Sequence, residues 1–202
     1  MAWDLQPVLA GQRVRLEPLT LDHAPEYLAA ADTDQVFRWM NRPRPHTLDA
    51  ARTIIASFID DPAWHPLAQI DVASGRLVGM TTFYDVSEPL RTLAIGATWL
   101  SQTAWGTGIN RESKLLLLTH AFEVLDCVRV VWHVDNLNER SQKAVLALGA
   151  THEGVLRKHR IRLDGTWRDT FTFSMLDTEW PHAKATRFSP TGSLSRSRQE
   201  PA

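Results

Sequence analysis

The sequence predicts a single α/β domain with about seven strands flanked by helices. Strand patterns and helical patterns alternate along the chain, which is typical of α/β domains. The chain has 202 residues, and a chain of this length buries a full core without disulfides or metal staples. The sequence shows no internal repeat, so one domain accommodates all of the elements.

The first 100 residues predict one strand, two helices and three further strands. Residues 12–18 alternate apolar and charged side chains and end at a proline, which favours a half-buried strand. In the last strand of this half, Leu93, Ile95 and Ala97 are expected to share one face. Gly96 within it indicates a bulge or a close backbone approach. The helices are predicted at residues 20–31 and 47–59, and the other strands at residues 67–72, 76–84 and 91–100.

The second half predicts a long helix, a strand, a short helix and a strand pair. Residues 109–125 repeat leucine and phenylalanine at helical spacing, so one face of this helix belongs to the core. The short helix is bounded by Asn138 at an N-cap position and by Gly149 just past its end. Asp164 and Gly165 form a strong hairpin signal. The remaining elements are predicted at residues 101–108 (a turn), 128–134 (a strand), 139–148 (the short helix), and 151–163 and 168–176 (the strand pair).

Charge and cysteine content exclude several classes of protein. Lysine plus arginine total 22 and aspartate plus glutamate total 23, a net charge of −1 that argues against specific nucleic-acid binding. The single cysteine, Cys127, permits neither an intrachain disulfide nor a multi-cysteine metal site, and we expect no metal. The sequence has neither an apolar run of about 18 residues nor a signal-peptide pattern at its N-terminus. We therefore expect a cytoplasmic protein with no membrane segment.

The segment from Trp99 to Glu112, W-L-S-Q-T-A-W-G-T-G-I-N-R-E, is the most informative in the chain. A strand runs into a short turn with two glycines, and the turn opens a helix. Consecutive backbone N–H groups at such a turn, together with the positive end of the helix, bind phosphate or pyrophosphate. The segment is neither a P-loop nor a dinucleotide-binding fingerprint, because no Gly-Lys-Ser/Thr follows and the third glycine is missing. Taken alone, it is equally compatible with a turn that uses glycine only for its geometry.

A second segment, V-D-N-L-N-E-R-S-Q-K-A-V-L-A-L-G-A-T-H-E-G, places Asn138 and Ser141 at the start of the short helix. Taken singly, the two residues are explained by an N-cap and a solvated hydroxyl. Together, the two segments resemble the GNAT superfamily of N-acetyltransferases and, within it, the ribosomal-protein alanine N-acetyltransferase-like branch. The resemblance extends from Arg13 to Trp180 and includes the W-G-x-G turn, N-x-x-S, L-G-A and E-G-V-L-R.

The resemblance implies a single-domain GNAT fold, with a mixed, mostly antiparallel central sheet flanked by helices. It implies an acyltransferase domain at residues 1–182 and acetyl-CoA as the cosubstrate. Residues 183–202 are rich in serine, arginine and proline, and we expect them to form a polar tail. Some members of the superfamily dimerise, so a homodimer is compatible with the resemblance.

In the family, backbone amides of the glycine turn hold the CoA pyrophosphate, and the preceding strand pairs with the pantetheine arm. Trp99 and Leu100 match the strand position. Asn138 and Ser141 match the family's asparagine and serine beside the pantetheine and the thioester sulfur. The sequence departs from the family pattern at Thr103, where the family has glutamine or arginine, so the pyrophosphate contacts are expected to rest more on backbone groups. The matching turn amides are those near Ala104, Trp105, Gly106, Thr107, Gly108 and Ile109.

The family reaction is direct attack of a primary amine on the acyl thioester in a ternary complex. A backbone N–H near Leu100 is expected to serve the developing oxyanion, and Ser141 is expected to donate to the thiolate. No carboxylate lies on the late strand where related enzymes place a base. His159 is the candidate there, since the ordinary pKa of histidine is near 6.5. The alternatives are His133, Asp135 and Glu112.

The absence of an obvious base favours an amine that loses its proton easily. A peptide α-amine has a pKa of about 7.7–8.0, so roughly a tenth is neutral at pH 7, whereas a lysine side chain near 10.4 is almost wholly charged. We therefore expect the acceptor to be a protein or peptide N-terminus or a small amine. The residues expected to recognise it lie at 37–46, Trp64 and 84–88.

Two other interpretations stay open. A transferase with a bulkier acyl donor, such as succinyl-CoA, would place a basic residue near the acyl end. A non-catalytic acyl-CoA-binding module would bind the donor without releasing its thiol. The basic run Arg157–Arg162 is expected to be a solvated strand face rather than a contact to an acidic partner such as RNA.

Overall fold

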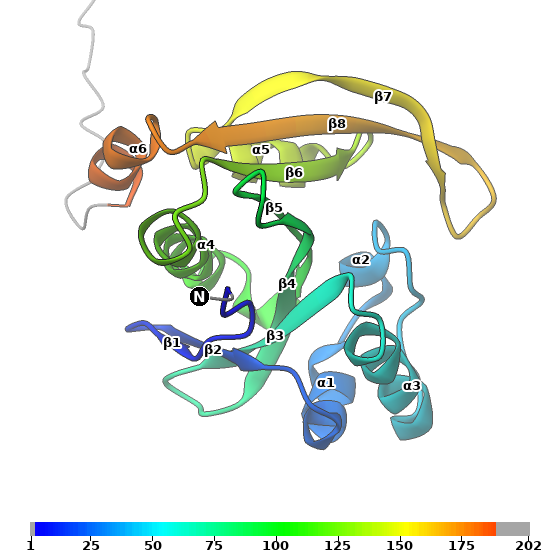
Figure 1. The fold of residues 1–202 in the computed structure, drawn as a ribbon. Helices are drawn as coiled ribbons and strands as arrows, with labels where there is room; N and C mark the ends of the chain where they lie inside the picture. The colour runs from blue at the N-terminus through cyan, green and yellow to red at the C-terminus, as the bar shows by residue number, and fades with distance from the viewer. Residues whose placement is uncertain (1–2, 189–202) are drawn as a thin grey trace, which may run out of the picture.

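The computed structural model describes residues 3–188 and contains an eight-stranded sheet (Figure 1). The strands follow the order β1-β2-β3-β4-β5-β6-β8-β7. Neighbouring strands are antiparallel except β5 and β6, which are parallel. The predicted mixed, mostly antiparallel sheet is confirmed, and the strand that the sequence patterns missed is the two-residue β1. The strands are β1 (Leu9–Ala10), β2 (Val14–Pro18), β3 (Trp64–Asp71), β4 (Leu77–Ser87), β5 (Thr92–Leu100), β6 (Arg129–Asp135), β7 (Thr151–Ile161) and β8 (Trp167–Leu176).

Helices cover both faces of the sheet. α1, α2 and α3 pack on one face of the central strands, and α4 packs on the other (Figure 1). The helix predicted at residues 20–31 is a 3₁₀ turn at Leu21–His23 followed by α1, which carries Pro25 in its first turn. α4 is followed directly by a π-helical turn at His120–Val124. The helices are α1 (Ala24–Ala30), α2 (Asp34–Phe37), α3 (Leu48–Ile59), α4 (Ile109–Thr119), α5 (Glu139–Ala147) and α6 (Trp180–Arg187).

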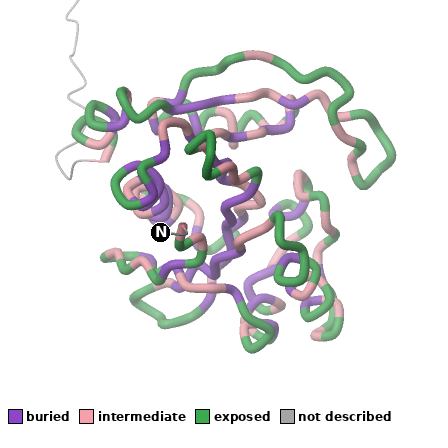
Figure 2. Tube along the Cα trace, viewed as in Figure 1, coloured by how far each residue is buried: buried purple, intermediate pink, exposed green. Residues whose placement is uncertain are grey.

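Buried residues form one hydrophobic cluster on each face of the sheet. Figure 2 shows buried positions along the central strands and along α4. On the face of α1–α3, the Trp99 ring of β5 packs between Tyr27 and Phe37, at centroid distances of 4.8 and 5.0 Å. On the opposite face, Leu117 of α4 and Phe83 of β4 are fully buried. Because β5 is packed from both sides, its backbone is fixed where it passes the middle of the molecule.

The central strands β5 and β6 pair only over a short stretch. Their register runs from Thr92 opposite Arg129 to Ala94 opposite Val131, and pairing ends there. A bulge follows in β5, where the β4 register shifts and Ala97 adopts a positive φ of 44°. Gly96 is required at this bulge, since a Cβ would lie 2.7 Å from the Tyr84 ring. β5 therefore bends away from β6, and the predicted bulge or close approach at Gly96 is confirmed.

The bulge overturns the expected facing of side chains in β5. Leu93 and Ile95 belong to the cluster on the α4 face, but Ala97 packs against the cluster on the α1–α3 face. The extra residue shifts the period-2 alternation, so that Thr98 returns to the α4 side, where it contacts Lys114. The prediction that Leu93, Ile95 and Ala97 share one face was wrong for this reason.

The C-terminal part of the described chain is helical. α6 begins at Trp180 and includes Ala183, which is 4% exposed and belongs to the core. The Trp180 indole donates to Glu123 Oε1 at 2.7 Å and so ties α6 to the π-helical turn that follows α4. The start of the predicted tail, residue 183, thus falls inside a packed helix, and residues 189–202 lie outside the described residues. Within residues 3–188, the helices are too short or too polar to cross a membrane.

A close backbone approach holds β4 against the far end of β5. A Cβ at Gly79 would lie 2.1 Å from the Trp99 carbonyl oxygen and 3.0 Å from the Leu100 Cα. The buried Gln69 amide of β3 donates to the carbonyls of both Met80 and Trp99, at 3.0 and 3.2 Å. These contacts fix the segment of β5 that has lost its pairing with β6.

Substitution of Gly79 by alanine should therefore destabilise the protein. The added Cβ meets backbone rather than a flexible side chain, so strands β4 and β5 must separate. This separation should lower the free energy of unfolding by about 2 kcal/mol or more. We expect the melting temperature of Gly79→Ala to fall by roughly 5 °C or more. Gly154→Ala is the matched control, because a Cβ there meets nothing within 4 Å. Equal melting temperatures for the two variants in calorimetry would contradict this account of β5.

Candidate active site

A cavity of about 1000 Å³ lies where β5 and β6 diverge. One wall is the unpaired stretch of β5 from Ile95 to Leu100, and the other is β6 from Trp132 to Asp135. Residues of the glycine turn, of α4 and of α5 close one end. The open edge of β5 offers backbone donors and acceptors, and an extended, amide-bearing chain pairs with such an edge in the manner of an added strand. The predicted pantetheine positions, Trp99 and Leu100, both line this cavity.

The glycine turn adopts the left-handed backbone that its sequence indicates. Gly106 and Gly108 have φ values of 75° and 90°, and Gly108 is the N-cap of α4. A Cβ at Gly106 would meet nothing within 4 Å, so this glycine serves the backbone conformation and leaves open space above it. The positive end of α4 thus opens at the cavity, as an anion site requires.

The predicted turn residues divide between the cavity and its surroundings. Ala104, Trp105, Gly106 and Gly108 line the cavity. The Ile109 side chain is buried in the core, and the Thr107 hydroxyl donates to the Ala104 carbonyl at 2.8 Å. Thr107 therefore braces the turn from behind.

Arginines surround the cavity at the glycine turn. The Arg140 guanidinium stacks over the Trp105 ring at 3.8 Å from its centroid, and burial lowers the pKa of Arg140. Arg111 donates to the Arg187 carbonyl, which brings α6 to the same end. All three arginines line the cavity. Cations, helix dipole and glycine backbone together suit a polyphosphate.

The start of α5 presents Asn138 and Ser141 to the cavity. Asn138 is the N-cap, and its Oδ1 accepts the Ser141 N–H at 3.1 Å, as predicted. Within residues 3–188 the Ser141 hydroxyl has no hydrogen-bond partner, so it is available to a ligand. The cap holds this hydroxyl in place through the backbone.

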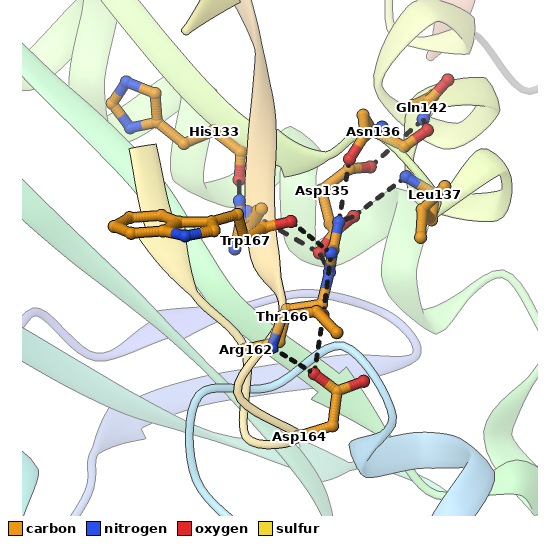
Figure 3. Close-up of polar contacts among 10 residues, drawn as sticks. His133, Asp135, Asn136, Leu137, Gln142, Arg162, Asp164, Thr166 and Trp167 are labelled. Carbon is orange, nitrogen blue, oxygen red and sulfur yellow. Dashed lines mark hydrogen bonds and ion pairs between the residues drawn. The ribbon is translucent and has the colours of Figure 1, made fainter. Parts of the chain in front are cut away.

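Asp135 joins the end of β6 to the β7–β8 hairpin (Figure 3). Arg162 donates to both of its carboxylate oxygens, at 2.8 and 2.9 Å, and the Leu137 N–H donates to Oδ1 at 2.9 Å. Burial opposes ionisation, but these donors outweigh it and hold the pKa of Asp135 below its usual range. Arg162 also donates to Asn136 Oδ1, and the Gln142 amide donates to the Asp135 carbonyl. Asp135 therefore positions the entrance to α5, where Asn138 and Ser141 lie.

Glu112, another carboxylate weighed as a base, is a structural residue. Its Oε2 accepts the N–H groups of Arg13 and Val14 at 2.6 and 2.9 Å, and its Oε1 accepts the Gln12 N–H at 3.0 Å. These bonds tie α4 to the start of β2. Glu112 is absent from the residues that line the cavity within the described part of the chain.

The other end of the cavity is aromatic and carries His133. Tyr84 OH lies 2.9 Å from His133 Nδ1, and the Trp64 ring stacks on Tyr84 at 5.0 Å. Burial chiefly lowers the pKa of His133, with nearby cations adding to the effect and Asp85 opposing it, which favours the neutral form of the ring at pH 7. His159 is exposed on β7, with its ring centroid 5.9 Å from that of His133. Of the two histidines, His133 lines the cavity.

The loop predicted to recognise the acceptor borders this aromatic end. Trp39, Met40 and Asn41, which follow the short α2, line the cavity with Trp64 and Tyr84. Residues 37–46 were expected to recognise the acceptor, and α2 ends at the first of them, Phe37.

Lys114 is a cavity residue that the sequence analysis missed. It is 5% exposed, and its Nζ donates to Thr98 Oγ1 at 2.8 Å and to Thr81 Oγ1 at 3.2 Å. Among residues 3–188 it has no carboxylate partner, and burial lowers its pKa to about 7. A lysine in an amphipathic helix ordinarily faces solvent, so only the packing of α4 on β4 and β5 reveals this one.

Comparison with known proteins identifies the family. Residues 13–151 match the model of the acetyltransferase (GNAT) domain. A putative acetyltransferase from T. thermophilus is 39% identical, with a TM-score of 0.84 over 91% of this chain and 96% of that one. A GCN5-related N-acetyltransferase from Brucella melitensis is 28% identical, with a TM-score of 0.87 over 96% and 92% of the two chains. The putative ribosomal N-acetyltransferase YdaF of Bacillus subtilis is 30% identical over 110 residues, 54% of this chain and 59% of that protein's length.

The fold is that of an acyltransferase. The chain belongs to the GNAT acetyltransferase family. It is therefore an N-acetyltransferase, and the cosubstrate of its family is acetyl-CoA. The glycine turn, the open edge of β5 and the arginines around the turn fit that cosubstrate.

Burial of Lys114 predicts a pH dependence of stability. Between about pH 7 and pH 10 the unfolded chain binds a proton at this amine and the folded chain does not, so stability rises with pH in this window. Lys114 contributes at most about 1.4 kcal/mol per pH unit to the slope of the free energy of unfolding against pH. Lys114→Met removes the titrating amine and with it this pH dependence. The Thr81 and Thr98 hydroxyls, 2.8 Å apart, keep their hydrogen bond to each other in the variant.

We expect Lys114→Met to be more stable than the wild type at pH 7, with the difference shrinking toward pH 10. Urea unfolding of both proteins at half-unit steps from pH 6 to pH 10 measures this. A constant difference in the free energy of unfolding between the two proteins from pH 6 to pH 10 would show that the amine is charged in the folded state.

Proposed function

We propose that this enzyme transfers the acetyl group of acetyl-CoA to the α-amine of a protein or peptide N-terminus. The observation that carries the proposal is the continuous cavity between β5 and β6. It has a cationic glycine turn at one end and a neutral histidine among aromatic rings at the other. Bound acetyl-CoA supplies an activated acyl thioester, and the residues around it bind, orient and move protons.

The proposed donor contacts follow from the geometry of the turn and of β5. The backbone near Ala104–Gly108 and the guanidinium of Arg140 bind the pyrophosphate. The open edge of β5 at Trp99 and Leu100 pairs with the amides of the pantetheine arm. Asn138 orients the start of α5, so that the Ser141 hydroxyl faces the thioester sulfur.

The proposed proton path begins at His133. With its Nδ1–H donated to Tyr84 OH, His133 accepts at Nε2 the proton that the attacking amine loses as its nitrogen bonds to the acyl carbon. His159, exposed and adjacent to His133, passes this proton to solvent. Ser141 donates a hydrogen bond, and then its proton, to the sulfur as the C–S bond breaks, and regains a proton from water.

The choice of an N-terminal α-amine rests on two observations. No carboxylate with a free oxygen faces the aromatic end of the cavity from the described residues that line it, so the base there is the weakly basic His133, which suits an α-amine better than the strongly basic amine of lysine. The relative YdaF carries the name of a ribosomal N-acetyltransferase, which favours a protein acceptor.

Thiol release from acetyl-CoA tests the acceptor class. We expect release with an Ala-starting peptide, and little with a matched N-blocked peptide that carries one free lysine. A reaction without amine is the control for hydrolysis. Release with the lysine peptide alone would overturn the α-amine proposal, and release with neither peptide despite acetyl-CoA binding would favour a small amine, another acyl donor or a non-catalytic module.

Ser141→Ala tests the proposed donor to the leaving group. Loss of a proton donor to the thiolate should lower kcat by roughly 100-fold or more, with little change in the KM for the peptide. Lys143→Ala is the matched control on the same helix, since Lys143 is exposed and makes a surface ion pair with Glu139 at 3.2 Å. Equal kcat values for the two variants would remove Ser141 from the mechanism.

A further inference from the structure

Two arginines face each other across β7 and β8 at the aromatic end of the cavity. Arg160 and Arg168 are register partners in the antiparallel pair, and both line the cavity. Like charges directly opposite each other on one sheet face are destabilising. An anion bound between the two guanidinium groups, or beside them, offsets this repulsion.

A bulge places Arg160 in this position. The β7–β8 register shifts between Leu156 and Arg160, and Lys158 adopts a positive φ of 47°. The Asp169 carboxylate accepts the Lys158 N–H at 2.7 Å and holds this backbone conformation. A left-handed lysine is strained backbone, and bulges beside binding sites commonly re-aim a side chain. The bulge around Lys158 therefore turns the end of β7, which carries Arg160, toward the cavity.

Neither arginine is fully paired within residues 3–188. The Arg160 side chain makes no ion pair or hydrogen bond there, although it lines the cavity. Arg168 donates to the His133 carbonyl at 3.1 Å, and its buried Nε has no hydrogen-bond partner and lies 3.8 Å from Asp135 Oδ2. Asp135 itself is held by the bidentate contact from Arg162. The remaining carboxylate at this end, Asp85, is exposed and lies 3.8 Å from His133 Nδ1. The positive charge of the pair is therefore only partly neutralised.

The position of the pair favours the acceptor as the source of an anion. The phosphates of the donor are assigned to the glycine turn at the opposite end, where Arg111, Arg140 and Arg187 lie. Arg160 and Arg168 instead border His133 and Tyr84, whose proton equilibria their charges perturb. An amine that approaches His133 brings its neighbouring groups past these arginines.

We propose that Arg160, with Arg168, binds a carboxylate carried by the acceptor next to its amine, and that the preferred substrate is a peptide N-terminus with Asp or Glu at its second position. This inference rests on the proposed function and names its substrate class. The carboxylate compensates the facing arginines. The arginines in turn disfavour the ammonium form of the amine, so that it enters neutral.

The experiment compares three peptides, identical except for Glu, Gln or Lys after an N-terminal Ala. For the wild type we expect kcat/KM to be about tenfold higher for the Glu peptide than for the Gln peptide, as a charge-assisted hydrogen bond allows, and lowest for the Lys peptide. Arg160→Gln should erase the Glu-over-Gln preference, mainly by raising the KM for the Glu peptide. Arg157→Gln, an exposed position on the same strand, is the matched control and should keep the preference.

Binding of the product peptides supplies a readout that needs no turnover. Titration calorimetry with CoA present compares N-acetylated Ala-Glu and Ala-Gln peptides on the same proteins. The same preference in binding without acetylation of any peptide would refute the proposed function and leave this inference standing.

Two results would overturn the inference. The first is equal kcat/KM and equal binding of the Glu and Gln peptides with the wild type. The second is a Glu-over-Gln preference that survives in Arg160→Gln. If that variant also loses the use of succinyl-CoA, the arginine is assigned to the acyl group.

Discussion

The separation of β5 from β6 is the constraint on which the site depends. A parallel pair that continued to the ends of both strands would fill the sheet and leave no opening between them. Here the pairing stops at Ala94, and the bulge at Gly96 and Ala97 turns β5 away. β6 keeps its other partner, β8, through Asp135. The result is an internal sheet edge, which a ligand with backbone-like amides can complete.

Two sets of contacts keep this opening from closing. On the β5 side, the close approach at Gly79 and the buried Gln69 amide bind β5 to its neighbours, and the Trp99 ring anchors it to α1 and α2. On the β6 side, Asp135 and Arg162 join the strand to the β7–β8 hairpin and fix the entrance to α5 (Figure 3). Apart from Trp99, which directly precedes the glycine turn, these residues lie far from the turn in sequence, yet both sets determine how far apart the walls of the cavity stand.

Local sequence rules predicted the parts of the site that are themselves local. The glycine turn follows from two glycines between a strand and a helix, and the Asn138 cap follows from an asparagine three residues before Ser141. The features that depend on register between distant strands were not predictable in this way. The facing of Ala97, the burial of Lys114 and the placement of Arg160 all follow from bulges or packing that become visible only when β4, β5, β7 and β8 are paired. Period-2 and period-3.6 patterns contain no information on where an extra residue enters a strand.

The distribution of charge in the cavity connects the two ends of the proposed reaction. In the proposed complex, the arginines at the glycine turn meet the phosphates of the donor, so donor binding neutralises their charge. The cations near His133 have no such partner on the donor, and they help to keep His133 and His159 neutral. A neutral His133 is the form that accepts a proton. A proton received there is disfavoured by Arg160 and Arg168, and the exposed ring of His159 gives it a short path to solvent. The same positive field that requires an anionic group on the acceptor therefore also drives the released proton out of the site.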